Sequence, residues 1–141
     1  MYKFFKIITL TFLSLFCLYP LSHSSEEKIK IGLLVPITGD DKKLGQQIIK
    51  STRIALKDIG NDRLEIYLKD TNSNPNQTIK SAIALREMGI KIVIGPVFYK
   101  SLAYLDEIKE ITFLSFTNKT LELPNNVISG GVNAASQLNA I

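Results

Sequence analysis

Residues 28–36 read Lys-Ile-Lys-Ile-Gly-Leu-Leu-Val-Pro. The stretch begins with alternating charged and apolar side chains and then becomes continuously apolar, which is typical of a strand buried on both faces of a parallel sheet. A turn at residues 38–41 follows. Apolar residues then recur at helical spacing from Leu44 to Ile59, where Gly60 provides a stop. The pattern predicts a strand, a turn and a helix.

The same unit recurs further along the chain. Residues 64–70 alternate between apolar and polar side chains and predict a second strand. Asn74 and Pro75 then provide an N-cap and a first helical residue, and Ile79, Ala82, Ile83 and the stem of Arg86 would line one face of the helix before Gly89. The remaining expected elements are a strand at 91–94, a helix at about 100–110, strands at 112–115 and 127–129, and a helix starting at Ala134.

Strands that alternate with helices at this spacing are joined by right-handed crossovers and form a parallel sheet covered on both faces. We therefore predict an α/β fold, doubly wound around a mostly parallel sheet, for residues 25–141. Ligands of such sheets bind beyond the carboxyl ends of the strands, where loops and helix N-termini converge. The loops at that edge are expected at residues 36–40, 69–74, 95–101, 115–120 and 129–133.

The first 24 residues have the pattern of a secretory signal peptide. Two lysines precede an almost uninterrupted apolar run at residues 7–19, and small residues end the segment at Ser24. An uncleaved membrane anchor is the alternative, but the run is shorter than the ~20 residues that span a bilayer. Lipid attachment at Cys17 is disfavoured by the bulky Phe16 before it. We expect cleavage after Ser24 and a periplasmic location.

Removing the signal also removes most reactive side chains. The chain of 141 residues has one cysteine, one histidine and no tryptophan, and both Cys17 and His23 lie in the signal. The rest has no thiol or imidazole for catalysis or metal binding. Asp40 and Asp41 precede a helix, where capping and the helix dipole explain them. The formal net charge of +4 falls by two with the signal lysines. We expect no enzyme activity, no cofactor, no metal and no nucleic-acid partner.

Five segments, taken in order, carry a family resemblance. They are IGLLVPITG (31–39), IALKDI (54–59), LKDTNSNP (68–75), IVIGPV (92–97) and LSFTN (114–118). Their order and spacing resemble the type 1 periplasmic-binding superfamily, in particular its leucine-binding-protein group. The resemblance implies two α/β lobes that close on a small solute. Because members of the family are far longer, it also implies that residues 25–141 are an N-terminal lobe segment and that the second lobe is absent.

The resemblance further implies a ligand site. In amino-acid-binding members, a small hydroxyl residue at the start of the third helix and a Ser/Thr turn after the fourth strand hold the solute's carboxylate and amine. Residues 115–118 match the turn, whereas Phe98-Tyr99-Lys100 stands where the small hydroxyl residue is expected and Ser101 comes slightly later. The candidate ligand-binding residues are Tyr99, Ser101, Ser115, Thr117 and Asn118.

Two functions stay open at this point. The first is binding of a small polar solute such as an amino acid, which would be delivered to a membrane ABC permease. The second follows from GPVFYKSLAYL (95–105) and FLSFTN (113–118), which are similar to the penicillin-binding-protein activators. Those envelope proteins regulate peptidoglycan synthases through protein contacts. The larger size of the solute-binding branch places that function slightly ahead.

Overall fold

The computed structural model describes residues 27–119 and 122–131. The expected signal peptide at residues 1–24 and the helix expected from Ala134 lie outside the described residues. Within them, five strands form one sheet in the order β2-β1-β3-β4-β5, and every neighbouring pair is parallel. The predicted α/β architecture with a parallel sheet is confirmed.

The quoted apolar stretch forms the central strand. β1 (Ile29–Val35) pairs with β2 (Leu64–Asp70) on one side and β3 (Ile92–Ile94) on the other, and its last four residues are buried. Burial between two strands and two faces explains the continuous apolar run. α2 (Lys42–Ile59) connects β1 to β2 and ends at Gly60, whose φ of 61° gives the expected left-handed stop.

α3 (Pro75–Glu87) begins where the sequence indicated. The Asn74 side-chain oxygen accepts hydrogen bonds from the backbone amides of Asn76 (2.8 Å) and Gln77 (3.1 Å), and Pro75 follows as the first helical residue. The buried face differs in part from the expected one, because polar side chains lie against the sheet edge. Ile79 and Ile83 are only partly buried, and the buried residues of the helix are Thr78, Ser81, Ala82 and Leu85.

The prediction of an α-helix over residues 100–110 is wrong. Two short 3₁₀ helices, η1 (Tyr99–Leu102) and η2 (Leu105–Glu107), occupy this segment, with Tyr104 in the left-handed region at φ 66° between them. The residues expected to face inward, Leu102, Leu105 and Ile108, are buried. They recur every third residue, which matches the 3.0 residues per turn of a 3₁₀ helix and drifts around an α-helix.

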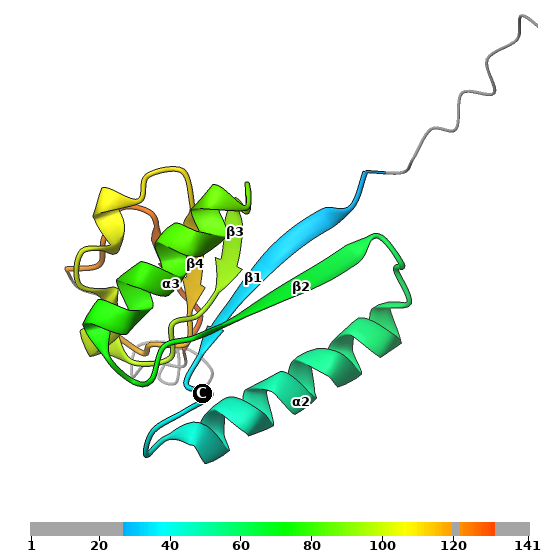
Figure 1. Cartoon of the computed structure of the whole chain (residues 1–141), viewed down its shortest axis with the longest axis horizontal. Helices are drawn as coiled ribbons and strands as arrows, with labels where there is room; N and C mark the ends of the chain where they lie inside the picture. Colours follow the sequence, from blue (N-terminus) through cyan, green and yellow to red (C-terminus); the bar gives the residue numbers. More distant parts are fainter. Residues whose placement is uncertain (1–26, 120–121, 132–141) are drawn as a thin grey trace, which may run out of the picture.

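β4 (Thr112–Ser115) and β5 (Val127–Ser129) coincide with the last two predicted strands. α3 and α2 cover opposite faces of the sheet (Figure 1). On the α3 face, Leu34, Val93 and Phe113 join Leu85 in the hydrophobic core. On the other face, α2 lies over β1 and β2. A cavity of about 120 Å³ separates them there, and it is lined by Ile49, Thr52, Arg53 and Leu56 of α2 and by Leu33, Ile66 and Leu68 of the sheet.

Beyond α2, the same face of the sheet is exposed. Ile94, Leu114 and Ile128 lie side by side across β3, β4 and β5. Leu114 is 38% exposed, Ile128 55% and Ile92, on the same face, 45%. We call Ile92, Ile94, Leu114 and Ile128 the open face. In the described part of the chain, no helix is long and apolar enough to cross a membrane.

Candidate functional site

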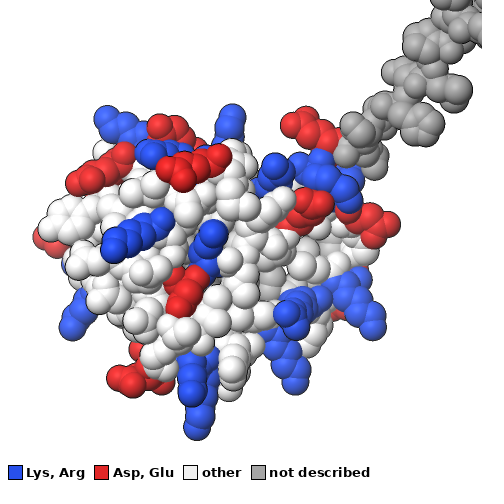
Figure 2. Space-filling view, in the orientation of Figure 1, with Lys and Arg blue, Asp and Glu red and all other residues white. Residues whose placement is uncertain are grey.

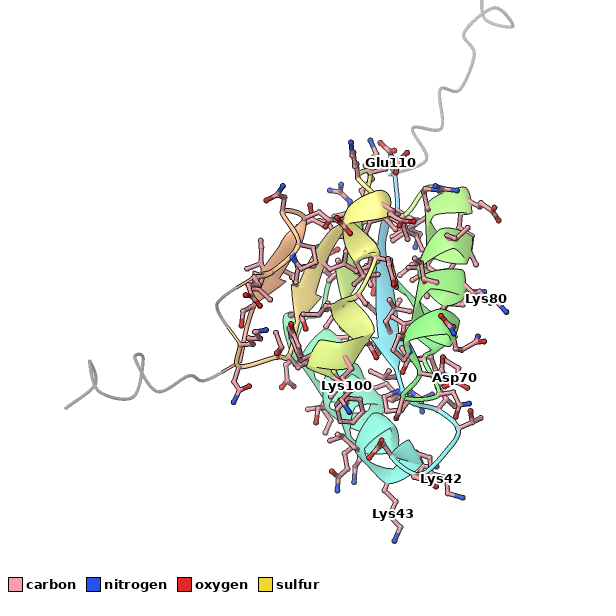
Figure 3. All side chains as sticks on the ribbon, turned by 90° about the vertical axis from the view of Figure 1, so that its left-hand side faces the viewer. Lys42, Lys43, Asp70, Lys80, Lys100 and Glu110 are labelled. Atoms are coloured by element: carbon pink, nitrogen blue, oxygen red, sulfur yellow. The ribbon has the colours of Figure 1, made fainter. Side chains whose placement is uncertain are left out.

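The five parallel strands end at one edge of the sheet, and the loops after them form its rim. Figure 3 shows Lys42, Asp70 and Lys100 at this end of the molecule and Glu110 at the opposite end. The chain moves from β1 to one side of the sheet to form β2, and to the other side to form β3 and β4. The crevice typical of such sheets therefore lies between the loops after β1 and β3.

The Asp70 carboxylate ties the loop after β1 to the loop after β2. Its Oδ1 accepts hydrogen bonds from the backbone amides of Ile37 (2.8 Å), Thr38 (3.3 Å) and Asn72 (2.8 Å). Its Oδ2 accepts a hydrogen bond from the Thr38 hydroxyl. Burial raises the pKa of the Asp70 carboxyl, but these hydrogen bonds outweigh it and hold the pKa below its ordinary value. Asp70 is therefore a charged anchor for one wall of the crevice.

Asp41 makes a second link between the same loops. It stands directly before α2, but its side chain makes no capping hydrogen bond, so the capping role predicted for it is wrong. Its Oδ2 instead accepts a hydrogen bond from the Ser73 hydroxyl at 2.7 Å. The loop after β2 brings this donor to Asp41, so the carboxylate links the two loops and does not bond to the amides at the start of α2.

The loops after β3 and β4 are joined in the same way. The Ser115 hydroxyl donates to the Pro96 carbonyl oxygen (2.8 Å) and accepts from the Thr117 amide (3.2 Å). Gly95 lies directly before this contact at φ 105°, and a Cβ there would come within 2.2 Å of the Leu34 carbonyl oxygen. Ser115, which is 1% exposed, therefore holds the two loops together with its only hydroxyl proton.

Thr117 connects β4 to the loop after β5. Its carbonyl oxygen accepts from the Ser129 hydroxyl (2.6 Å) and the Gly131 amide (3.0 Å), and its Oγ1 accepts from the Lys119 amide (3.2 Å). The Thr117 hydroxyl proton has no acceptor among the described residues, whereas the neighbouring Asn118 is exposed. Thr117 is only 4% exposed, so Asn118 is the one predicted site residue on this loop that is open to solvent.

Tyr99 is joined to the same loop by a lysine that the sequence reasoning missed. The Lys119 ammonium lies 3.8 Å above the centre of the Tyr99 ring, donates to the Tyr99 hydroxyl and pairs with Glu122 at 3.3 Å. The hydrogen bond to Tyr99, reinforced by Glu122, raises the pKa of Lys119. The only feature of the sequence that could have pointed to Lys119 is its position directly after the predicted turn at residues 115–118.

Ser101 occupies a different environment. Its side chain is 1% exposed, and its hydroxyl has no hydrogen-bond partner among the described residues. Among the described residues, no α-helix begins beside Tyr99, where the third helix was expected. η1 has four residues, and such a short 3₁₀ helix lacks the aligned peptide dipoles of an α-helix.

The site offers hydroxyl, amide and ammonium groups, which suit binding. No group of three or more His, Cys, Asp or Glu side chains that could hold a metal ion occurs among residues 27–119 and 122–131. Lysine, arginine and acidic side chains are interspersed on the face shown in Figure 2. These features describe a polar rim around a crevice.

Comparison with known proteins identifies the class of fold. No family model matches the chain. The segment is similar to LivJ of Streptococcus pneumoniae, solved in complex with isoleucine, at a TM-score of 0.67 and 18% identity over 76% of this chain and 34% of that one. The fold expected from the resemblance, that of the type 1 periplasmic-binding proteins, is confirmed, and the match covers about a third of the LivJ chain.

Two further relatives represent the two functional branches. The Leu/Ile/Val-binding protein BraC3 of Rhizobium johnstonii is 29% identical over 98 residues, which are 65% of this chain and 26% of that protein. The C-domain of LpoA from Haemophilus influenzae, described as a regulator of PBP1A, is 25% identical at a TM-score of 0.56, over 73% of this chain and 32% of that one. The chain thus spans about a quarter of the curated relative it matches.

Proposed function

We propose that this chain is part of a non-enzymatic, exported binding protein that takes up a small polar solute such as an amino acid. The head group of the solute would lie on the β3 side of the crevice, at the rim between the loops after β3 and β4. The supporting observation is the convergence of Tyr99, Thr117, Asn118 and Lys119 at this rim in a fold shared with branched-chain amino-acid-binding proteins. No cofactor takes part.

The side chains at the rim have two roles in this proposal, contact with the solute and positioning of the loops. Thr117 and Asn118 supply a hydroxyl and a carboxamide, and Lys119 supplies an ammonium group next to the Tyr99 ring. A carboxylate is the natural partner of such donors. Ser115 positions the loops through Pro96, and Ser101 lies beneath them with an unused hydroxyl. Closure of a second lobe over the rim would bury the solute, and a membrane ABC permease would receive it in the periplasm.

The Thr117→Val variant tests this assignment. Valine keeps the shape of threonine and removes the hydroxyl, so amino-acid affinity should fall about tenfold while the fold is kept. Binding is measured by calorimetry against a panel of amino acids. Thr112→Val is the matched control, because Thr112 is exposed at the opposite end of the same strand. Equal affinity of the two variants would remove Thr117 from the site.

A second candidate function rests on the LpoA C-domain, which matches this chain at 25% identity. The chain would then regulate a peptidoglycan synthase by direct contact, and the rim would not need a solute. A pull-down with the exported chain, residues 25–141, separates the two functions. Retention of a penicillin-binding protein without any amino-acid binding would favour regulation over solute binding.

A further inference from the structure

A cavity of about 380 Å³ lies against η1, η2 and the segment that leads to β5. Its volume falls in the range of about 300–1,000 Å³ that is usual for small-molecule sites. Ser115 and Thr117 do not line it, so it is distinct from the proposed solute rim, although both share Tyr99. The described lining consists of Tyr99, Lys100, Leu102, Ala103, Tyr104, Asp106, Glu122, Leu123 and Pro124.

Tyr104 provides an observation independent of the cavity volume. Its φ of 66° and ψ of 8° place a bulky residue in the left-handed region, which is strained for a side chain of this size. The side chain is nevertheless 62% exposed, so packing does not explain the strain. Residues in such conformations are found at turns and are concentrated at binding sites, and Tyr104 lies at the turn between η1 and η2. Here the strained residue presents an aromatic ring at the cavity.

The charges around the cavity are balanced. Lys119 neutralises Glu122 at 3.3 Å while it covers the Tyr99 ring. Lys100 and Asp106 remain in the lining, one as a donor and one as an acceptor. A ligand with a net charge would meet a like charge at one of them. A neutral ring with several hydroxyl groups can donate to Asp106 and accept from Lys100 at the same time.

We propose that this cavity binds one pyranose ring of a saccharide. The C–H face of the ring would pack on Tyr104 and the apolar floor of Leu102, Leu123 and Pro124, and its hydroxyl groups would bond to Lys100 and Asp106. A pyranose has an apolar surface only where its C–H groups gather on one face of the ring. An exposed aromatic side chain such as Tyr104 can pack against that face. The site stands whether or not the rim binds an amino acid.

The test is a nuclear magnetic resonance titration of the ¹⁵N-labelled exported chain with N,N′-diacetylchitobiose and with maltose. Saturable shifts should appear at residues 99–106 and 122–124 for at least one of these saccharides. Tyr104→Leu should weaken binding about tenfold, because the stacked ring is lost. Tyr104→Phe should keep it, because the ring remains. Phe116→Leu is the matched control, since Phe116 is an exposed aromatic residue outside the lining.

Tyr104→Gly adds a readout that a purely structural residue would not give. Glycine adopts the left-handed conformation without strain, so this variant should unfold at a higher urea concentration and yet lose the saccharide response. The proposal is overturned if neither saccharide gives saturable shifts, or if Tyr104→Leu binds as well as the parent. It is also overturned if the cavity responds to n-butylammonium or benzoate and to neither saccharide.

Discussion

Asp70 links two loops of the rim with one carboxylate. Four hydrogen bonds from three residues reach its two oxygens, and they hold its pKa below the ordinary value in the folded chain. In the unfolded chain, the pKa returns to about 3.9. The group therefore stabilises the fold fully above that pH, and this contribution is lost as the pH falls through the folded-state pKa.

We expect the free energy of unfolding to fall more steeply below about pH 4 in the parent than in Asp70→Asn, because the variant cannot titrate there. Urea unfolding between pH 2 and 7 measures the difference. Asp106→Asn, which removes an exposed carboxylate, is the control and should follow the parent. Parallel pH curves for the parent and Asp70→Asn would rule out the anchor role.

The side-chain amide of Asn126 donates hydrogen bonds to the backbone of the segment around η2. Its Nδ2 lies 2.8 Å from the Leu105 carbonyl oxygen, 2.9 Å from that of Ile108 and 3.1 Å from that of Ile111. Asn126→Ala should destabilise the chain by about 1–3 kcal/mol, because buried carbonyls lose their donor. Asn126→Asp should cost more, since a carboxylate would face the same oxygens. Urea unfolding checks both variants, and the exposed Asn125→Ala should be close to neutral.

At the scale of elements, the start of α2 depends on a glycine. A Cβ on Gly45 would lie 1.8 Å from the Pro36 carbonyl oxygen, which is a backbone atom that cannot rotate away. Alanine is the better helix former by about 1 kcal/mol, so propensity alone predicts stabilisation. The two effects oppose each other, and the contact is the stronger one.

Gly45→Ala should therefore lower the free energy of unfolding by about 1–3 kcal/mol, as overpacked sites do. Chemical unfolding at neutral pH measures the change. Ser51→Ala, at an exposed position of the same helix, should be neutral or slightly stabilising. If Gly45→Ala proved as stable as Ser51→Ala, the close approach of α2 to the loop after β1 would be wrong.

The sequence predicts the strands better than the segment between β3 and β4. β4 and β5 coincide with the predicted ranges because each has buried, alternating side chains between clear turns. Leu102, Leu105 and Ile108 were assigned to the correct side, but their helix type was not. A repeat of three apolar positions is compatible with either helix over a short window, and the left-handed Tyr104 has no sequence signature.

The candidate site, too, is only partly predictable from the sequence. The topology predicts which loops meet at the rim, since parallel strands end at one edge. The topology does not predict which hydroxyl groups already have an acceptor within the protein, as the Ser115 hydroxyl has in the Pro96 carbonyl oxygen. Nor does it predict the hydrogen bond from the Ser73 hydroxyl to the Asp41 carboxylate. Lys119 was missed because an exposed lysine has no periodic pattern, and its role depends on the distant Tyr99.

At the scale of the whole molecule, the open face is an apolar surface on the described part of the sheet. Ile92, Leu114 and Ile128 are each more than a third exposed on the side of the sheet that α2 leaves uncovered. Contiguous apolar surface of this kind favours association or weakens a small fold. We therefore expect residues 25–141 alone to be marginally stable, to associate with increasing concentration, and to bind a hydrophobic dye.

The double variant Ile92→Thr/Ile128→Thr should reduce both dye binding and association, because threonine keeps the strand preference and adds a hydroxyl group. Sedimentation velocity across a concentration series and dye fluorescence measure the two effects. A strictly monomeric parent that binds no dye and unfolds in one sharp thermal transition would contradict this expectation.

The proposed function requires that the rim between the loops after β3 and β4 holds a solute. The most direct test is a chemical-shift titration of residues 25–141 with L-isoleucine and other amino acids, which also detects weak binding. The account predicts saturable shifts at residues 95–101 and 115–119, with none around Glu110 at the opposite end. No saturable shifts with any amino acid, or shifts confined to the Glu110 end, would contradict it.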